Sequence, residues 1–117
     1  MGVDTLLTLR RPFVADHYHD LPGFVEDRHG HNWEAEATFP VRDTGDEADC
    51  AAALEAWVAR LDYTLLNDQE PLRGRNPTAE LLAQWLFRFL EDRGRPAAKV
   101  RLREKANYWA ACLRPAP

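Results

Sequence analysis

All four histidines of the chain lie in one short segment, at His17, His19, His29 and His31. His29 and His31 flank Gly30, so on an extended strand both imidazoles project from the same face. If the preceding segment pairs with this strand, His17 or His19 can bring a third imidazole to the same point. Three imidazoles without a fourth protein ligand are typical of a catalytic zinc site, in which water or substrate takes the open position. A His-Gly-His pattern alone also fits surface histidines without a function; the side shared with His17 favours zinc, although iron, cobalt or nickel would also bind there.

Glu104 is the second unusual residue, because it falls on the apolar face of an alternating segment, in register with Val100 and Leu102. A carboxylate that faces a core is costly unless it is paired or binds a ligand. It can form an ion pair across a subunit contact. Alternatively, it can anchor a ligand by accepting two parallel N–H bonds from an amidine-like edge, such as that of a pterin or a guanine.

Two alternating segments must position the histidines. From Leu7 to His17 one face of the segment is apolar at every second position, with Arg11 as the exception. From His29 to Phe39 apolar and polar residues alternate again. Two such segments joined by a turn-rich loop predict an antiparallel strand pair. A polar connector is expected from Pro40 to Asp49.

The period then changes to that of helices. Apolar residues at helical spacing predict a short amphipathic helix from Ala51 to Leu61. A second helix is predicted to start with Asn76 as N-cap and Pro77 at the first helical position, and Gly94 supplies a left-handed stop. Two further strands are expected, Lys99–Lys105 and Tyr108–Leu113. The order β-β-α-α-β-β predicts an α+β fold in which two helices cover one face of a four-stranded antiparallel sheet.

Length and composition restrict the kind of protein. The chain has 117 residues and a formal net charge of −4, so we expect one domain over residues 1–117 and neither nucleic acid nor an anionic membrane as the main partner. Its two cysteines, Cys50 and Cys112, form no Cys-x-x-Cys pair, which favours a reducing, cytoplasmic compartment. Helices on one face leave the other face of the sheet open, although there are four tryptophans to bury. We therefore expect subunit contacts, with a monomer as the alternative.

Five motifs occur in order: Phe13-Val14-Ala15-Asp16-His17, His29-Gly30-His31, Leu61-Asp62-Tyr63-Thr64-Leu65-Leu66-Asn67, Asn76-Pro77-Thr78-Ala79-Glu80 and Val100-Arg101-Leu102-Arg103-Glu104. Together they resemble the 6-pyruvoyltetrahydropterin synthase family, which includes the 6-carboxytetrahydropterin synthases. The resemblance implies a tunnelling-fold subunit in an oligomeric barrel, a homohexamer built as a dimer of trimers with active sites between subunits. It implies a zinc ion on His17, His29 and His31. It also implies a small-molecule pterin substrate, with the substrate-binding residues Glu104, Thr78 and Glu80.

Two departures from the family pattern concern the acid–base residues. The family's catalytic cysteine is replaced by Val25, and the histidine after its aspartate is Tyr63, so only Asp62 of that set remains. However, Glu26 fits a subgroup that reads Glu-x-x-His-Gly-His, in which a glutamate stands in for the cysteine. That resemblance implies Glu26 as the acid–base group, with Asp62 as an auxiliary. For Glu26, the alternative is a solvated loop carboxylate.

The subgroup resemblance implies cleavage of the side chain of 7,8-dihydroneopterin triphosphate to 6-hydroxymethyl-7,8-dihydropterin, a folate precursor. Formation of a pyruvoyl product needs several proton transfers and suits two distinct acid–base groups. Retro-aldol cleavage needs a metal-acidified hydroxyl and one carboxylate, which favours cleavage here. Two alternatives remain: a 6-carboxy-5,6,7,8-tetrahydropterin synthase of queuosine biosynthesis, and a non-catalytic homologue that binds a pterin or a purine.

Overall fold

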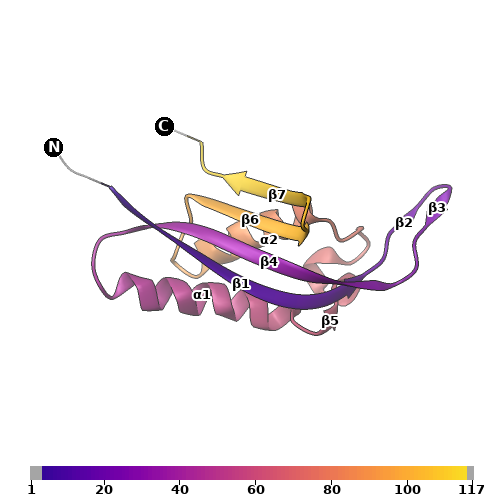
Figure 1. Ribbon diagram of the computed structural model, residues 1–117, viewed down its shortest axis with the longest axis horizontal. Helices are drawn as coiled ribbons and strands as arrows, with labels where there is room; N and C mark the ends of the chain where they lie inside the picture. Colours follow the sequence, from indigo (N-terminus) through magenta and orange to yellow (C-terminus); the bar gives the residue numbers. More distant parts are fainter. Residues whose placement is uncertain (1–3, 116–117) are drawn as a thin grey trace.

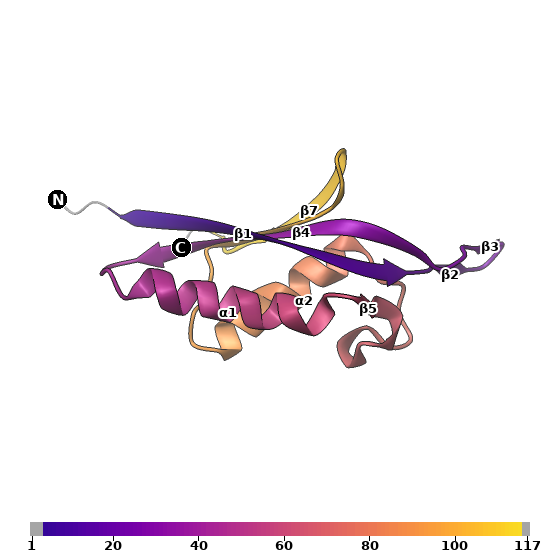
Figure 2. The ribbon, with the colours of Figure 1, turned by 60° about the horizontal axis from the view of Figure 1, so that its bottom comes forward.

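A twisted sheet covered on one face by two helices makes up the computed structural model, which describes residues 4–115 (Figures 1 and 2). The main sheet has the strand order β5-β1-β4-β6-β7. Its strands are β1 (Thr5–His17), β4 (His29–Val41), β5 (Thr64–Leu65), β6 (Lys99–Lys105) and β7 (Tyr108–Leu113). A separate two-stranded ribbon, β2 (Asp20–Leu21) and β3 (Phe24–Val25), extends beyond this sheet at the end where β1 stops. The α+β class and the two helices on one face are confirmed.

The first two long strands pair as the alternation predicts. β1 and β4 are antiparallel along their whole length, and His17 lies opposite His29. Phe13, Ala15 and His17 are buried on the helix side of β1, whereas Pro12 before them and Val14 between them are exposed. This register brings the ends of both strands, with their histidines, to one end of the sheet.

A short fifth strand corrects the expectation of a purely antiparallel, four-stranded sheet. β5 pairs in parallel with β1, with Ala15 opposite Thr64 and Asp16 opposite Leu65, so the sheet is mixed. Two residues are too few to show a period, which is why the sequence pattern did not predict this strand. Two short 3-10 helices follow it, Leu66–Asp68 and Glu70–Leu72.

Both helices start at residues other than the predicted ones. α1 (Asp46–Leu61) begins inside the expected connector, because Asp46 accepts hydrogen bonds from the backbone N–H groups of Arg42 and Asp43. α2 (Ala79–Asp92) has Thr78 as its N-cap, so the prediction of Asn76 as N-cap and Pro77 as the first helical residue was wrong. The Thr78 hydroxyl accepts from the backbone N–H of Leu81, whereas the Asn76 side chain bonds to Asp20.

The core between sheet and helices is aromatic beneath the histidines. The ring of Phe13 stacks on Trp33 with centroids 6.0 Å apart, and its edge contacts Trp57 at 5.8 Å. The opposite face of the sheet is charged. There, Glu36 pairs with Arg10 at 3.2 Å and with Arg101 at 3.1 Å. Within residues 4–115, neither helix has the length and the apolar character that a membrane span requires.

Candidate metal and substrate site

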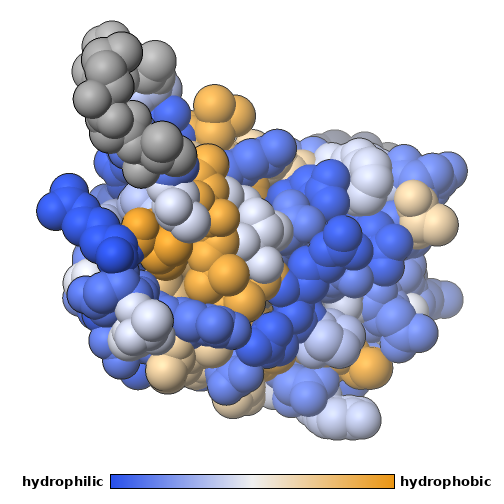
Figure 3. Space-filling model, turned by 60° about the vertical axis from the view of Figure 1, so that its left-hand side comes forward, coloured by the Kyte–Doolittle hydropathy of each residue, from blue (hydrophilic) through white to orange (hydrophobic). Residues whose placement is uncertain are grey.

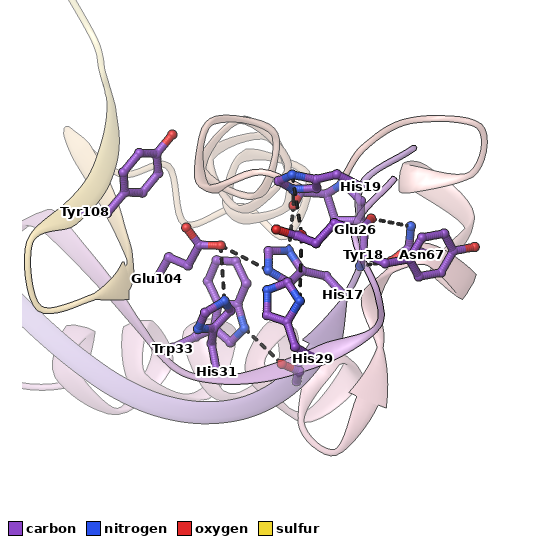
Figure 4. Close-up of polar contacts among 12 residues, drawn as sticks. His17, Tyr18, His19, Glu26, His29, His31, Trp33, Asn67, Glu104 and Tyr108 are labelled. Atoms are coloured by element: carbon purple, nitrogen blue, oxygen red, sulfur yellow. Dashed lines mark hydrogen bonds and ion pairs between the residues drawn. The ribbon is translucent and has the colours of Figure 1, made fainter. Parts of the chain in front are cut away.

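Three imidazoles converge where β1 ends and β4 begins (Figure 4). The ring centroids of His17 and His29 are 4.6 Å apart, and those of His17 and His31 are 4.9 Å apart. One ring nitrogen from each of the three lies within 4.8 Å of the others. The cross-strand register supplies the first pair, and the alternation of β4 adds His31 on the same face. The structure therefore brings together the three residues predicted to bind zinc.

Backbone carbonyls orient two of these rings. His17 Nδ1 lies 2.9 Å from the carbonyl oxygen of Pro77, and His29 Nδ1 lies 2.9 Å from that of Asp27. A carbonyl oxygen only accepts, so each Nδ1 carries the proton and each Nε2 keeps its lone pair. Within residues 4–115, His17 Nε2 is buried and forms no hydrogen bond, because the atom 3.0 Å from it is a carboxylate oxygen of Glu104, which does not donate. Such an unsatisfied nitrogen, with its ring fixed from the other side, fits a metal ligand.

Burial favours the neutral form of two of the imidazoles. The pKa of His17 is lowered mainly by its burial, against a hydrogen bond to the Pro77 carbonyl and the charge of Glu104, which raise it. The pKa of His31 is lowered for the same first reason, with Glu104 again opposing. A metal ion binds the neutral form of an imidazole, so the lowered pKa values of His17 and His31 favour metal binding.

Glu26 lies beside this cluster and faces two histidines. Its Oε1 atom is 3.6 Å from His19 Nδ1 and 3.7 Å from His29 Nδ1, and it is buried without a hydrogen-bond partner. His17, His19 and Glu26 also form a second set whose ligand atoms lie within 4.8 Å of one another. Val25, the preceding residue, is 75% exposed.

Glu104 reaches the same cluster from β6. Its Oε1 atom lies 3.0 Å from His17 Nε2 and 3.6 Å from His31 Nε2, and its side chain is 12% exposed. The pairing of β6 with β7 is irregular between Arg103 and Lys105, so Glu104 has no partner in the register. Irregularities of this kind commonly re-aim a side chain beside an active site. The carboxylate is therefore within reach of any ligand held at the histidines.

Thr78 and Glu80, the other predicted substrate-binding residues, lie at the start of α2. The Thr78 hydroxyl caps the helix, and Glu80 Oε1 accepts a hydrogen bond from the hydroxyl of Tyr108 at 3.0 Å. The pKa of Glu80 is lowered, first by a hydrogen bond from its own backbone N–H. Tyr108 extends from β7 on the side of Glu104 (Figure 4). Sequence reasoning missed Tyr108; the only signal was an aromatic residue just after the Glu104 strand.

Asp62 is not brought to the histidines within one chain. Its Oδ1 atom accepts a hydrogen bond from the backbone N–H of Val14 at 2.9 Å, on the outer edge of β1. Tyr63 follows in the left-handed region with a φ of 59° and is 83% exposed. The two cysteines also lie elsewhere, Cys50 buried in α1 and Cys112 in β7.

The comparisons with known proteins agree with this architecture. A family model described as 6-pyruvoyl tetrahydropterin synthase matches residues 7–115. A protein of Archaeoglobus fulgidus named "Putative 6-carboxy-5,6,7,8-tetrahydropterin synthase" is 32% identical over 103 residues, covering 82% of this chain and 86% of that protein.

Two solved structures share the fold at low sequence identity. The 6-pyruvoyl tetrahydropterin synthase of Caenorhabditis elegans has a TM-score of 0.76 at 18% identity, covering 98% of this chain and 100% of that one. The Plasmodium vivax enzyme has a TM-score of 0.75 at 12% identity with the same coverage, in a variant that replaces a glutamate named as its catalytic residue.

Proposed function

The chain belongs to the 6-pyruvoyl tetrahydropterin synthase family, and on this premise we propose that it is a zinc-dependent pterin lyase. The proposed reaction cleaves the side chain of 7,8-dihydroneopterin triphosphate to give 6-hydroxymethyl-7,8-dihydropterin. The observation that carries the proposal is Glu26, whose buried carboxylate oxygen has no hydrogen-bond partner and lies beside the three imidazoles. A carboxylate in that position is free to take a proton from a bound substrate.

The metal would be held by His17, His29 and His31. The assignment is supported by the buried Nε2 of His17, which faces the Glu104 carboxylate without a hydrogen bond, and by the Nδ1 atoms of His17 and His29, which backbone carbonyls hold in place. A zinc ion bound there would supply Lewis-acid chemistry to the side-chain hydroxyls of the substrate.

The side chains of the protein then bind the pterin and transfer the proton. Glu104 accepts two N–H bonds from the amidine-like edge of the pterin, with Thr78 and Glu80 at the border of that pocket. Glu26 takes the proton of the hydroxyl on the second side-chain carbon as the bond to the first carbon breaks. The electron pair of that bond delocalises into the pterin ring until a proton returns to the first carbon. The second carbon leaves as an aldehyde, so no external oxidant or reductant is needed.

A second candidate reaction has a specific observation in its favour. The A. fulgidus relative carries the name of a 6-carboxytetrahydropterin synthase. Against this, Val25 stands at the position of the family's cysteine, Glu26 beside it fits the Glu-x-x-His-Gly-His pattern, and the P. vivax enzyme is described with a catalytic glutamate. We therefore favour side-chain cleavage, with the carboxy product and simple pterin binding as the other outcomes.

Product analysis tests the proposal. Incubation of the metal-loaded protein with 7,8-dihydroneopterin triphosphate should give the hydroxymethyl pterin, and Glu26→Gln should abolish turnover while the protein still binds zinc. Glu70→Gln, at an exposed residue of a 3-10 helix, is the matched control and should leave turnover unchanged. A carboxy product, no product, or an active Glu26→Gln variant would each contradict the proposed reaction.

The unpaired edges of the sheet support an oligomer, which we propose to be a hexamer. Among residues 4–115, β5 pairs only with Ala15 and Asp16 of β1, and β7 is the last strand in the order of the sheet. Exposed apolar side chains lie on both edge strands, with Leu6 58% and Leu113 64% exposed. Figure 3 shows hydrophobic residues gathered among charged ones at the end of the molecule where β1 begins. Asp62, on the β1 edge, would then be available to the site of a neighbouring subunit.

We also propose a cytoplasmic location. Both cysteines are free thiols, and one of them is buried. Free thiols fit a reducing compartment.

A further inference from the structure

The outer edge of β1 loses its strand partner close to the histidines. β5 pairs with Ala15 and Asp16, and β1 itself ends at His17. Beyond that point, the backbone groups of the chain that face the outer edge would be left without a strand partner. Unpaired backbone groups at a partly buried site are costly, so their partners need to be identified.

Two asparagine side chains supply these partners. The backbone N–H of Tyr18 donates to Asn67 Oδ1 at 3.0 Å, and the amide of Asn67 donates back to the Tyr18 carbonyl at 3.0 Å. The backbone N–H of Asp20 donates to Asn76 Oδ1 at 2.7 Å, and the amide of Asn76 donates to the Asp20 carbonyl at 3.4 Å. A primary amide carries the same donor and acceptor as a peptide group, so each asparagine imitates one residue of a neighbouring strand.

The spacing of these contacts continues the edge of the sheet. In an extended chain every second residue directs its N–H and C=O to the same edge. Val14 already follows this rule, with its N–H on Asp62 Oδ1 and its carbonyl on the backbone N–H of Tyr63. Tyr18 and Asp20 follow at the same spacing, so side chains extend the β5 pairing past the last strand residue.

This arrangement connects directly to the imidazoles. Tyr18 lies between His17 and His19 in the sequence, so its two bonds to Asn67 fix the backbone from which both rings project. The residue after Asn76 is Pro77, whose carbonyl faces His17 Nδ1 at 2.9 Å and His19 Nε2 at 3.3 Å. Asn76 therefore holds both the backbone after the histidines and the peptide that orients their rings.

We infer that Asn67 and Asn76 are positioning residues of the metal site, acting together as an amide clamp on residues 18–20. The inference rests on the proposed function, since it assumes that the imidazoles bind a divalent ion. Asn67 and Asn76 belong to two of the five motifs named above, and in this role they touch neither the ion nor the substrate. Partners that orient metal ligands commonly contribute about 10–100-fold to metal affinity.

Cobalt(II) binding to the full chain tests the clamp without any activity measurement. The variants are Asn67→Ala, Asn76→Ala and Asn67→Asp, with Asn107→Ala as control, because Asn107 is an exposed residue of the β6–β7 turn. The measurements are the Kd for Co²⁺, the visible spectrum of the bound ion, and hydrogen exchange of the Tyr18 and Asp20 amides in metal-free protein.

The Asn67→Asp variant separates geometry from charge. Its carboxylate can accept from the Tyr18 N–H but cannot donate to the Tyr18 carbonyl, and its negative charge alone would strengthen cation binding. We expect weaker binding nonetheless, and for both alanine variants an increase in Kd of about tenfold or more with an altered spectrum. Tyr18 and Asp20 amides should exchange faster in the variant that removes their own partner. The control should match the wild type in all three measurements.

Two results would overturn the inference in different ways. Folded variants with the Kd and spectrum of the wild type would reduce both asparagines to a structural role, while leaving the proposed metal site intact. A wild type that binds no cobalt, zinc or iron would instead refute the proposed function, and the positioning role with it. If an alanine variant fails to fold, Asn67→Asp, which keeps one of the two bonds, decides the question.

Discussion

Substitution of Gly30 by alanine tests why a glycine separates the two histidines of β4. Gly30 lies opposite Asp16 in the register, and a Cβ atom at this position would be 2.7 Å from Asp16 Oδ1. Leaving aside the two chain neighbours of Gly30, Asp16 is the only residue of the described part of the chain with an atom within 4 Å of this Cβ, so the conflict is with one carboxylate oxygen. That carboxylate is held over the glycine by an ion pair with Arg28 at 2.7 Å.

The cost of the substitution follows from these contacts. Asp16 must rotate and give up Arg28, but the two side chains are 36% and 58% exposed, so the pair contributes only about 0–1 kcal/mol. The φ of Gly30 is outside the left-handed region, so alanine is compatible with the backbone there. Replacing glycine at a compatible position stabilises by about 0.4–1 kcal/mol through the unfolded chain. We expect the free energy of unfolding of Gly30→Ala to stay within about 1 kcal/mol of the wild type.

A double-mutant cycle with Asp16→Ala isolates the conflict. In the Asp16→Ala background the Cβ atom meets no carboxylate, so Gly30→Ala should stabilise the protein by about 0.4–1 kcal/mol. The assay is urea unfolding of the four proteins, followed by tryptophan fluorescence. A loss of more than about 2 kcal/mol in both backgrounds would refute the reasoning, because the glycine would then be needed for a reason other than Asp16.

Two further predictions concern acid stability and assembly. Hydrogen bonds from the backbone of Arg42, the side chain of Arg95 and the backbone of Asp43 hold the pKa of Asp46 at about 2, below its ordinary 3.8. The folded-state pKa is lowered, so the stabilisation is present above about pH 4 and is lost as the pH falls toward 2; urea unfolding should show Asp46→Asn less stable at neutral pH, with a gap that narrows near about pH 3. A gap independent of pH would rule out this ionisation as its source. Sedimentation velocity at micromolar concentration should show an oligomer, and a monomer would contradict the proposed assembly.

The sequence predicts β1, β4 and the alignment of their histidines, because the alternation of apolar and polar residues allows only one face of each strand to be buried. A shift of one residue between β1 and β4 would turn either Phe13 or Trp33 out of the core, so the sequence predicts that His17 and a histidine of β4 lie on the same face. The inward position of Glu104 was predictable for the same reason. The starts of the two helices were not, since Asn76 and Thr78 are both good N-caps and only the tertiary contact of Asn76 with Asp20 decides between them.

The residues of the candidate site could be predicted from the sequence, but the groups that hold their side chains in place could not. The spacing of the histidines identified the imidazoles, the family resemblance pointed to Glu26, and the structure brings them together. The carbonyl of Pro77 and the amide of Asn67 belong to no periodic pattern, and their roles depend on a chain path between distant segments. Asp62 shows the limit most clearly, because its motif suggested chemistry whereas its contact within one chain is with the backbone of Val14.

The indole of Trp33 packs against the histidine cluster and provides an intrinsic fluorophore beside the candidate metal site. The ring of Trp33 is 1% exposed and lies 5.2 Å from the ring of His17 and 5.8 Å from that of His31. Its Nε1 atom donates to the Ala15 carbonyl at 3.2 Å, which fixes its orientation. We therefore expect the fluorescence of this buried indole to change when the imidazoles bind an ion, so that occupancy can be followed in the native chain without an attached dye.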